Sequence, residues 1–295
     1  MSRTSYTTVS GHFLDMDSPC MKLWQKAKKF GIWNPNEIDF SQDAVDWNNM
    51  THDEREMTMR SLVQFLAGEE SVTIDILPLI MVMAQEGRLE EEMFLTSFLW
   101  EEAKHVDGFI RFFREVVQRE EDLTEYIQPS YDIIFKDMLP NAMNALLKDP
   151  SPENQARASV TYNMIVEGVL AETGYFGFFQ TLEKFDIMPG LRKFVGKLKQ
   201  DESRHIAYGI YLLSRLIAEH GDSVWEAIQD QMNKLMIPAM GLVQESYEGF
   251  DPIPFDQDPQ VYNAYAMDQF QKRFARLERA RNQSLEEVNA LALAE

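Results

Sequence analysis

The sequence predicts an all-α protein, a bundle of long helices with a four-helix core and additional flanking helices. Proline (12) and glycine (14) are scarce among the 295 residues, whereas an all-β chain needs many turns. Apolar residues recur at steps of three and four, and no segment alternates with period two for long enough to form a sheet. As a helix, residues 152–185 would span about 50 Å, a length typical of helical bundles.

Glycine and proline residues divide the chain into its expected elements, which are helices at residues 14–31, 52–86, 88–118, 123–148, 152–185, 190–219, 222–248 and 257–278. Residues 1–50 are expected to be an irregular segment that wraps over the end of the bundle, anchored by its aromatic side chains. Residues 279–295 are expected to form further helix or a frayed tail. Because no linker interrupts the chain, residues 1–295 are expected to form one domain.

Composition excludes several classes of protein. The 48 acidic and 28 basic residues give a formal charge of −20, which disfavours binding to nucleic acid or anionic lipid. Cys20 is the only cysteine, so an intramolecular disulfide, a thiolate zinc cluster and an iron–sulfur cluster are excluded. No signal peptide is recognisable, and the longest apolar stretch, 76–84, contains Pro78 and is shorter than the ~20 residues of a membrane span. The expected location is the cytoplasm, without a transmembrane segment.

Two expected helices carry a Glu-x-x-His pair in the middle of an apolar face. The inward positions of helix 88–118 are Leu95, Phe98, Glu102, His105, Phe109 and Phe112. The inward positions of helix 190–219 are Leu191, Val195, Leu198, Glu202, His205, Gly209 and Leu212. Residues three apart share a helix face, so each pair can bind one cation together.

Two further helices carry one acid each on the corresponding face. These acids are Glu69 on helix 52–86 and Glu167 on helix 152–185. The chain order is therefore Glu, Glu-x-x-His, Glu, Glu-x-x-His, as if one helix pair occurred twice. Four glutamates and two histidines are the ligand set of di-metal carboxylate bundles.

Buried carboxylates need compensation, because an uncompensated one costs several kcal/mol. Protons could neutralise the four glutamates, and so could basic side chains, but Lys104 and Arg204 are expected to point to other faces. Two metal ions compensate the charge better, and oxygen and nitrogen ligands without thiolates favour iron or manganese. Asp201 and Tyr175 could orient the ligands from outside.

These residues make the chain resemble the ferritin-like superfamily, and specifically the ribonucleotide reductase small subunit, over residues 20–215. The shared motifs are Trp33-Asn34-Pro35, Ile38-Asp39-Phe40-Ser41, Gly68-Glu69-Glu70, Glu101-Glu102-Ala103-Lys104-His105, Val166-Glu167-Gly168 and Asp201-Glu202-Ser203-Arg204-His205. Two departures argue against a reductase role. Phe109 occupies the position of the radical tyrosine, and the last tyrosine is Tyr265, not one in a C-terminal docking tail.

Segments 68–78 and 162–168 are more similar to the ligand-binding oxidases related to that subunit. The resemblance implies a homodimer, a bound long-chain fatty acid, and an ether cross-link between Tyr162 and Val72. It also implies one manganese held by Glu69, Glu102 and His105 and one iron held by Glu167, Glu202 and His205, or two irons, with the glutamates of the Glu-x-x-His pairs bridging the ions. Trp33 and Asp201 match the reductase electron relay. Small or apolar residues that could line the ligand cavity are Gly68, Val72, Gly168, Ala171 and Gly174.

The expected reaction is dioxygen activation followed by oxidation of an unactivated C–H bond, in Val72 or in a bound lipid. Three alternatives remain open at this point. The first is a reductase small subunit of the Mn/Fe type that lacks a tyrosyl radical. The second is a non-catalytic lipid carrier, and the third is an iron-storage protein, which should be shorter and form a shell.

Overall fold

The computed structural model describes residues 6–9, 13–119 and 121–294. The part described is helical and contains no strand, which confirms the all-α prediction. The helices are α1 (Pro19–Phe30), α2 (Ser41–Asn49), α3 (His52–Asp75), α4 (Leu77–Glu86), α5 (Leu89–Phe112), α6 (Pro129–Asp132), α7 (Leu139–Ala145), α8 (Pro152–Ser159), α9 (Glu172–Lys184), α10 (Pro189–His220), α11 (Asp222–Glu245), α12 (Pro259–Ala280) and α13 (Leu285–Ala294).

Three π-helical stretches extend or join these helices. They are Phe113–Val117 after α5, Ile133–Met138 between α6 and α7, and Val160–Ala171 between α8 and α9. The last makes 152–184 one continuous helical rod, as the sequence predicts. π-helical turns insert extra residues into a helix and often occur at functional sites.

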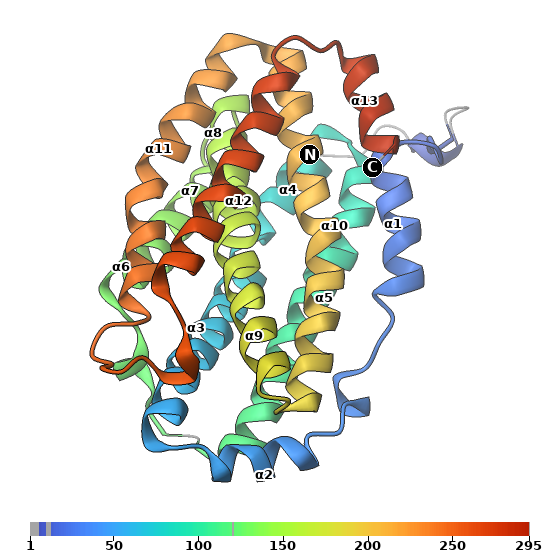
Figure 1. The fold of residues 1–295 in the computed structure, drawn as a ribbon. Helices are drawn as coiled ribbons and strands as arrows, with labels where there is room; N and C mark the ends of the chain where they lie inside the picture. The colour runs from blue at the N-terminus through green and yellow to red at the C-terminus, as the bar shows by residue number, and fades with distance from the viewer. Residues whose placement is uncertain (1–5, 10–12, 120, 295) are drawn as a thin grey trace.

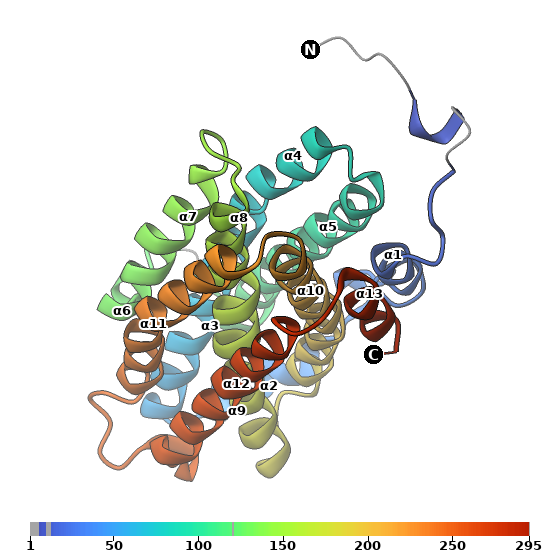
Figure 2. The same cartoon turned by 90° about the horizontal axis from the view of Figure 1, so that it is seen from above.

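Four long helical segments form the centre of the bundle: α3, α5, α10, and α9 with the π-helical stretch before it. Figure 1 shows α3, α5, α9 and α10 side by side, and Figure 2 shows α11 and α12 on one flank with α1 and α13 on the other. The buried apolar side chains form one connected core from Cys20 of α1 to Ala280 of α12. Within the residues described, none of these helices is long and apolar enough to cross a membrane.

Two predicted helices differ from the structure because of proline. The single helix expected over 52–86 is wrong, since α3 ends at Asp75 and α4 begins at Leu77. Pro78 has no amide hydrogen and its ring clashes with the carbonyl four residues earlier, which accounts for the break at this point. The helix expected from residue 123 likewise begins only at Pro129.

The N-terminal segment is more helical than the irregular one expected. It contains the unpredicted helix α2, whose Asp43 accepts hydrogen bonds from the amides of Gly190 (2.9 Å) and Leu191 (2.6 Å). Asp43 thereby caps the first turn of α10, where amide hydrogens lack partners within the helix. Residues 1–5 and 10–12 of this segment lie outside the described residues.

At the other end of the chain, α13 forms the further helix that was one of the two expectations for 279–295. It packs against α10 and α1. Glu295 lies outside the described residues.

Candidate metal centre

The structure brings the six predicted ligand residues together in the middle of the bundle. Their side chains come from α3 (Glu69), α5 (Glu102, His105), the π-helical stretch 160–171 (Glu167) and α10 (Glu202, His205). All six are buried, and none is more than 5% exposed. Their ligand atoms form two groups, each with its atoms within 4.8 Å of one another.

Two glutamates belong to both groups. One group contains Glu69, Glu102, His105 and Glu202, and the other contains Glu102, Glu167, Glu202 and His205. The arrangement therefore offers two adjacent cation positions with Glu102 and Glu202 between them. That these two glutamates bridge the ions stays a prediction.

Unpartnered polar atoms test whether metal ions fit this centre. Glu102 Oε2, Glu167 Oε1, Glu202 Oε2 and His205 Nδ1 are buried without a hydrogen-bond partner. Buried polar atoms are almost always hydrogen-bonded, so a group of four orphans is unusual. All four atoms are electron-pair donors to a cation, and carboxylate oxygen with imidazole nitrogen suits iron and manganese. The residues present therefore fit a metal pair.

The pKa values also favour cation binding at this cluster. Burial raises the pKa of Glu69 to about 8, and burial together with Glu202 raises the pKa of Glu167 well above its usual range. Burial, with Glu102, raises the pKa of Glu202. In Glu102 burial is outweighed by the two neighbouring histidines, which lower its pKa. The metal-free cluster therefore holds protons that cations can replace.

Metal binding at about pH 6.5 is expected to release protons, because Glu69, with its pKa of about 8, is protonated there in the metal-free protein. Calorimetry in buffers of different ionisation enthalpy measures this release. It should decrease as pH rises through 8 and should be smaller in Glu69→Gln. The same raised pKa stabilises the metal-free fold below pH 4.5, and this contribution is lost as pH rises through 8. A proton release that does not change with pH would contradict the assignment.

Each histidine points one ring nitrogen at the cluster and the other at an outer acid. His105 Nδ1 lies 3.2 Å from Glu69 Oε2, and His205 Nδ1 lies 3.3 Å from Glu102 Oε1. On the outer side, His105 Nε2 lies 3.4 Å from Asp201 Oδ2, as expected for an orienting group. Such carboxylates fix the ring orientation of histidine ligands.

Glu101 is the orienting acid that the sequence interpretation missed. Its Oε2 lies 2.9 Å from His205 Nε2, and its side chain is fully buried. The sequence contains a pattern that could have identified this role, because Glu101 precedes Glu102 just as Asp201 precedes Glu202. The pairing is crossed, since the acid on α5 serves the histidine on α10 and the acid on α10 serves the histidine on α5.

Two buried cations balance these outer acids. Arg204 Nη2 lies 2.7 Å from Glu101 Oε1 and 2.5 Å from Asp201 Oδ1. Lys104 Nζ lies 3.1 Å from Asp201 Oδ2 and donates to the Gly31 carbonyl at 2.6 Å. Neither cation forms an ion pair with the six cluster residues in the described chain, so they do not replace metal ions there.

The aromatic site residues lie around the cluster. Trp33 Nε1 donates to Asp201 Oδ2 at 2.8 Å, and Tyr175 OH lies 3.5 Å from Glu202 Oε1. Tyr162 OH donates to the Val72 carbonyl at 3.0 Å and lies 3.3 Å from Glu102 Oε1. The residues expected to be cross-linked are thus neighbours.

A mostly apolar cavity with a volume of about 170 Å³ opens from the cluster. Gly68, Val72, Ala171 and Gly174 line it, together with Glu69, Glu102, Glu167 and Glu202 at its inner end. It extends toward α9, the end of α11 and the start of α12. Gly168 was expected to line it but does not. A Cβ there would lie 2.9 Å from Arg273 Nε, so this glycine allows close packing against α12.

The family model for the ribonucleotide reductase small chain matches residues 14–283. Among solved structures, an R2-like ligand-binding oxidase from Sulfolobus acidocaldarius is 38% identical, with a TM-score of 0.88 over 97% of this chain and 98% of that chain. A variant of an R2-like ligand-binding oxidase with an anaerobically reconstituted Mn/Fe cofactor is 39% identical, with a TM-score of 0.87 over 93% and 98%. Another such variant, also with an anaerobically reconstituted Mn/Fe cofactor, has 39% identity and a TM-score of 0.89 over 94% and 98%.

Proposed function

The chain belongs to the ribonucleotide reductase small chain family, and within it we propose a dioxygen-activating di-metal oxidase that binds a long-chain fatty acid. The similarity to Mn/Fe ligand-binding oxidases over most of the chain supports an oxidoreductase with a metal pair. The observation that carries the proposal is the six-residue cluster at the inner end of an apolar cavity, with Tyr162 and Val72 in contact beside it.

We assign the ligands as the resemblance implies. Glu69, Glu102 and His105 would hold manganese, and Glu167, Glu202 and His205 would hold iron, with two irons as the alternative. Bound in reduced form, such a pair supplies electrons for dioxygen activation. The chain itself contributes a water-poor site, because the ligands are buried and the cavity wall is mostly apolar.

The cavity wall favours a ligand with an anionic head and an apolar tail. Among the residues that the structure describes, the charged ones lining the cavity are the four glutamates, so no basic side chain there is available for a carboxylate. An acid head can therefore be neutralised only by the bound cations, and its alkyl chain would extend outward between α3 and α9. Apolar walls with few polar groups are typical of ligand pockets.

Gly68→Leu is expected to weaken fatty-acid binding at least tenfold, since one misplaced methylene in an apolar pocket costs about 1–3 kcal/mol. Gly68→Ala is the matched control, because an added Cβ meets Tyr131 and Phe135 at 3.4 Å and 3.6 Å, ordinary contact distances. Mass spectrometry of organic extracts, with metal content measured in parallel, quantifies bound acid. Equal binding by both variants with unchanged metal content would contradict the placement of the ligand.

The protonation and the position of the Tyr162 phenol support the proposed cross-link. Burial and the nearby Glu102 raise the pKa of Tyr162 well above its usual range, so the phenol remains protonated at neutral pH. An ether bond from its oxygen to a Val72 side-chain carbon releases the phenol proton and one C–H hydrogen. Dioxygen accepts the two electrons, and Glu102 Oε1, 3.3 Å away, is a base for the phenol proton.

Air exposure of protein loaded with Mn(II) and Fe(II) is expected to yield a peptide pair joining Val72 to Tyr162 and lighter by two hydrogens. Digestion and mass spectrometry detect it. Tyr162→Phe and a sample kept anaerobic should lack the joined peptides. Full metal loading without any joined peptide would remove the main reason for preferring the oxidase.

The hydrogen-bonded line Trp33–Asp201–His105 favours a second candidate, a reductase small subunit of the Mn/Fe type without a tyrosyl radical. Ribonucleotide reduction on adding a reductase large subunit would identify it. A lipid carrier would consume no oxygen when loaded with reduced metals. We also propose a homodimer, on the resemblance alone, and a cytoplasmic location, with which the single cysteine is compatible.

A further inference from the structure

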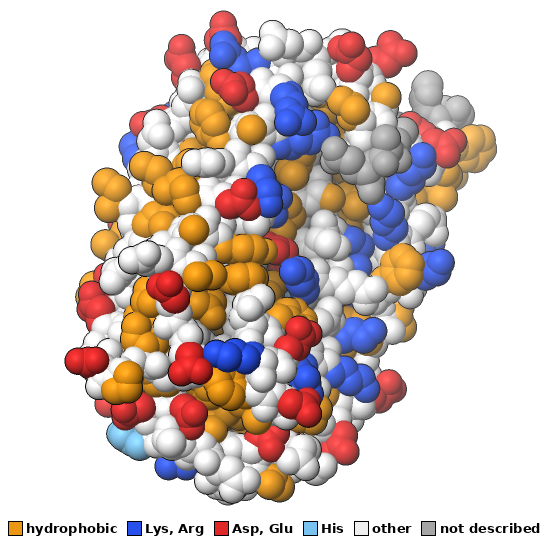
Figure 3. All heavy atoms as spheres, viewed as in Figure 1, with side chains coloured by type: hydrophobic (Ala, Val, Ile, Leu, Met, Phe, Trp, Pro, Cys, Tyr) orange, Lys and Arg blue, Asp and Glu red, His pale blue; other side chains and the backbone are white. Residues whose placement is uncertain are grey.

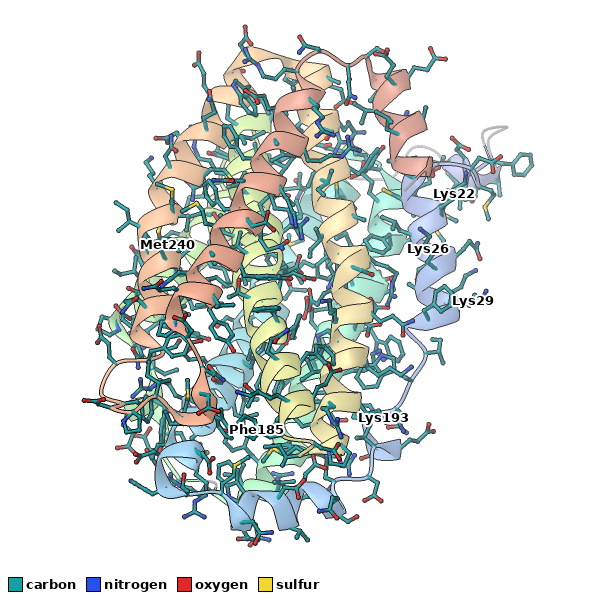
Figure 4. All side chains as sticks on the ribbon, in the orientation of Figure 1. Lys22, Lys26, Lys29, Phe185, Lys193 and Met240 are labelled. Carbon is teal, nitrogen blue, oxygen red and sulfur yellow. The ribbon has the colours of Figure 1, made fainter. Side chains whose placement is uncertain are left out.

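A stripe of lysines covers one side of this acidic protein. We call Lys22, Lys26 and Lys29 of α1, with Lys193 of α10, the lysine face. The three on α1 are spaced by four and three residues and so lie on one side of the helix. Figure 4 shows the four labelled lysines following one another down the same side of the molecule, and Figure 3 shows Lys and Arg side chains gathered there.

The lysine face is a local reversal of the overall charge. Residues 18–36 and 189–200 contain eight of the 28 basic residues and no Asp or Glu, although the chain carries a charge of −20. All four lysines are exposed, and no described carboxylate forms an ion pair with them. Asp39 is near Lys193, but hydrogen bonds from Ser41 are the main cause of its lowered pKa. The positive charge is therefore available to a partner.

A short polar path leads from this face to the metal centre. Helix α1 ends at Phe30, and Trp33 follows three residues later. Trp33 Nε1 donates to Asp201 Oδ2 at 2.8 Å, and the same oxygen lies 3.4 Å from His105 Nε2. The Lys104 ammonium lies 4.1 Å from the centre of the Trp33 ring and links it to the C-terminus of α1.

The cavity mouth lies elsewhere, which distinguishes a protein partner from a membrane. Neither α1 nor residues 189–200 line the cavity, which opens toward α11 and α12. In Figure 1 α11 is on the side opposite α1. A membrane that delivered lipid would have to contact the cavity mouth. The lysine face lies instead over the path to His105.

We propose that the lysine face docks an acidic one-electron carrier protein, which reduces the metal pair through the Trp33 side of the centre. Two reduced carriers each lose one electron, and the two oxidised metal ions each gain one. The electron transfer in this proposal rests on the proposed oxidase. The docking does not, because it is argued from the exposed lysines. Complementary charge acts mainly on the association rate and decreases with salt.

The docking test measures binding of a plant-type [2Fe–2S] ferredoxin to the metal-loaded protein by calorimetry at low salt. The charge-reversed variant is Lys22→Glu/Lys26→Glu/Lys29→Glu. The matched control, Lys136→Glu/Lys234→Glu/Lys272→Glu, makes the same change in net charge at exposed lysines on other elements. We expect the first variant to lose more than about tenfold in affinity and most of the salt dependence, and the control to lose little. Glutamine at positions 22, 26 and 29 should give an intermediate loss.

Stopped-flow reduction of the oxidised metal-loaded protein by reduced ferredoxin, without oxygen, tests electron entry. The rate should decrease in the charge-reversed variant and not in the control, while reduction by dithionite stays equal. If dithionite reduces none of them, the proposed function fails, but the binding result still decides docking. Equal affinity and equal rates in the two variants would overturn the proposal. Lysine-dependent binding to vesicles of anionic lipid, without ferredoxin binding, would overturn it in favour of a membrane.

Discussion

Glu102→Gln is expected to empty both metal positions at once, because Glu102 belongs to both groups of ligand atoms. Loss of an outer orienting group alone typically costs 10–100-fold in metal affinity, so loss of a shared ligand should cost more than about 100-fold at each position. Elemental analysis after gel filtration measures the result, and oxygen consumption should disappear with the metals.

Glu69→Gln is the matched comparison, because Glu69 belongs to one group only. It makes the same side-chain change in the same centre, but it should weaken one position and leave the other occupied. If Glu102→Gln retained two ions per chain, or if Glu69→Gln lost both, the sharing inferred from the geometry would be wrong.

Arg215→Met is expected to lower the free energy of unfolding of the metal-free protein by up to about 3–5 kcal/mol, the cost of removing one partner of a buried ion pair. Among the described residues, only the partly exposed Arg88, whose Nη1 lies 3.6 Å from Glu91 Oε1, then remains beside Glu91. Arg215 is 1% exposed, and its Nε lies 3.3 Å from Glu91 Oε1. Glu91 is itself buried, and Tyr208 OH donates to it at 3.2 Å. Urea denaturation measures the change.

Two controls separate charge from packing. Arg281→Met removes a solvent-exposed ion pair with Asp222 and should cost less than about 1 kcal/mol. Adding Glu91→Gln to Arg215→Met should recover most of the stability, because neither charge then remains buried. A double variant as unstable as the single one would show that lost packing of the arginine causes the effect.

Periodicity predicted most of the fold and the composition of the centre. The helix expected at 190–219 is observed at Pro189–His220, because its inward positions recur at steps of three and four along its whole length. The six cluster residues could be predicted because acids and histidines on an apolar face are costly unless something compensates them, and helical spacing fixes which side they share.

Contacts between distant parts of the chain could not be predicted in this way. Asp43 caps a helix that begins almost 150 residues later, and a helical pattern contains no information about that pairing. Glu101 is next to a recognised ligand, but its partner His205 is on another helix. The position of Gly168 against Arg273 likewise depends on how α12 packs, which the local sequence does not encode.

The crossed pairing of Glu101 with His205 and of Asp201 with His105 has a mechanical consequence. Each of α5 and α10 carries the acid that orients the other helix's imidazole, so a slide of one helix along the other misaligns both rings together. Tight packing between these two helices would therefore hold both imidazoles in place together, and a substitution that shifts either helix is expected to disturb both.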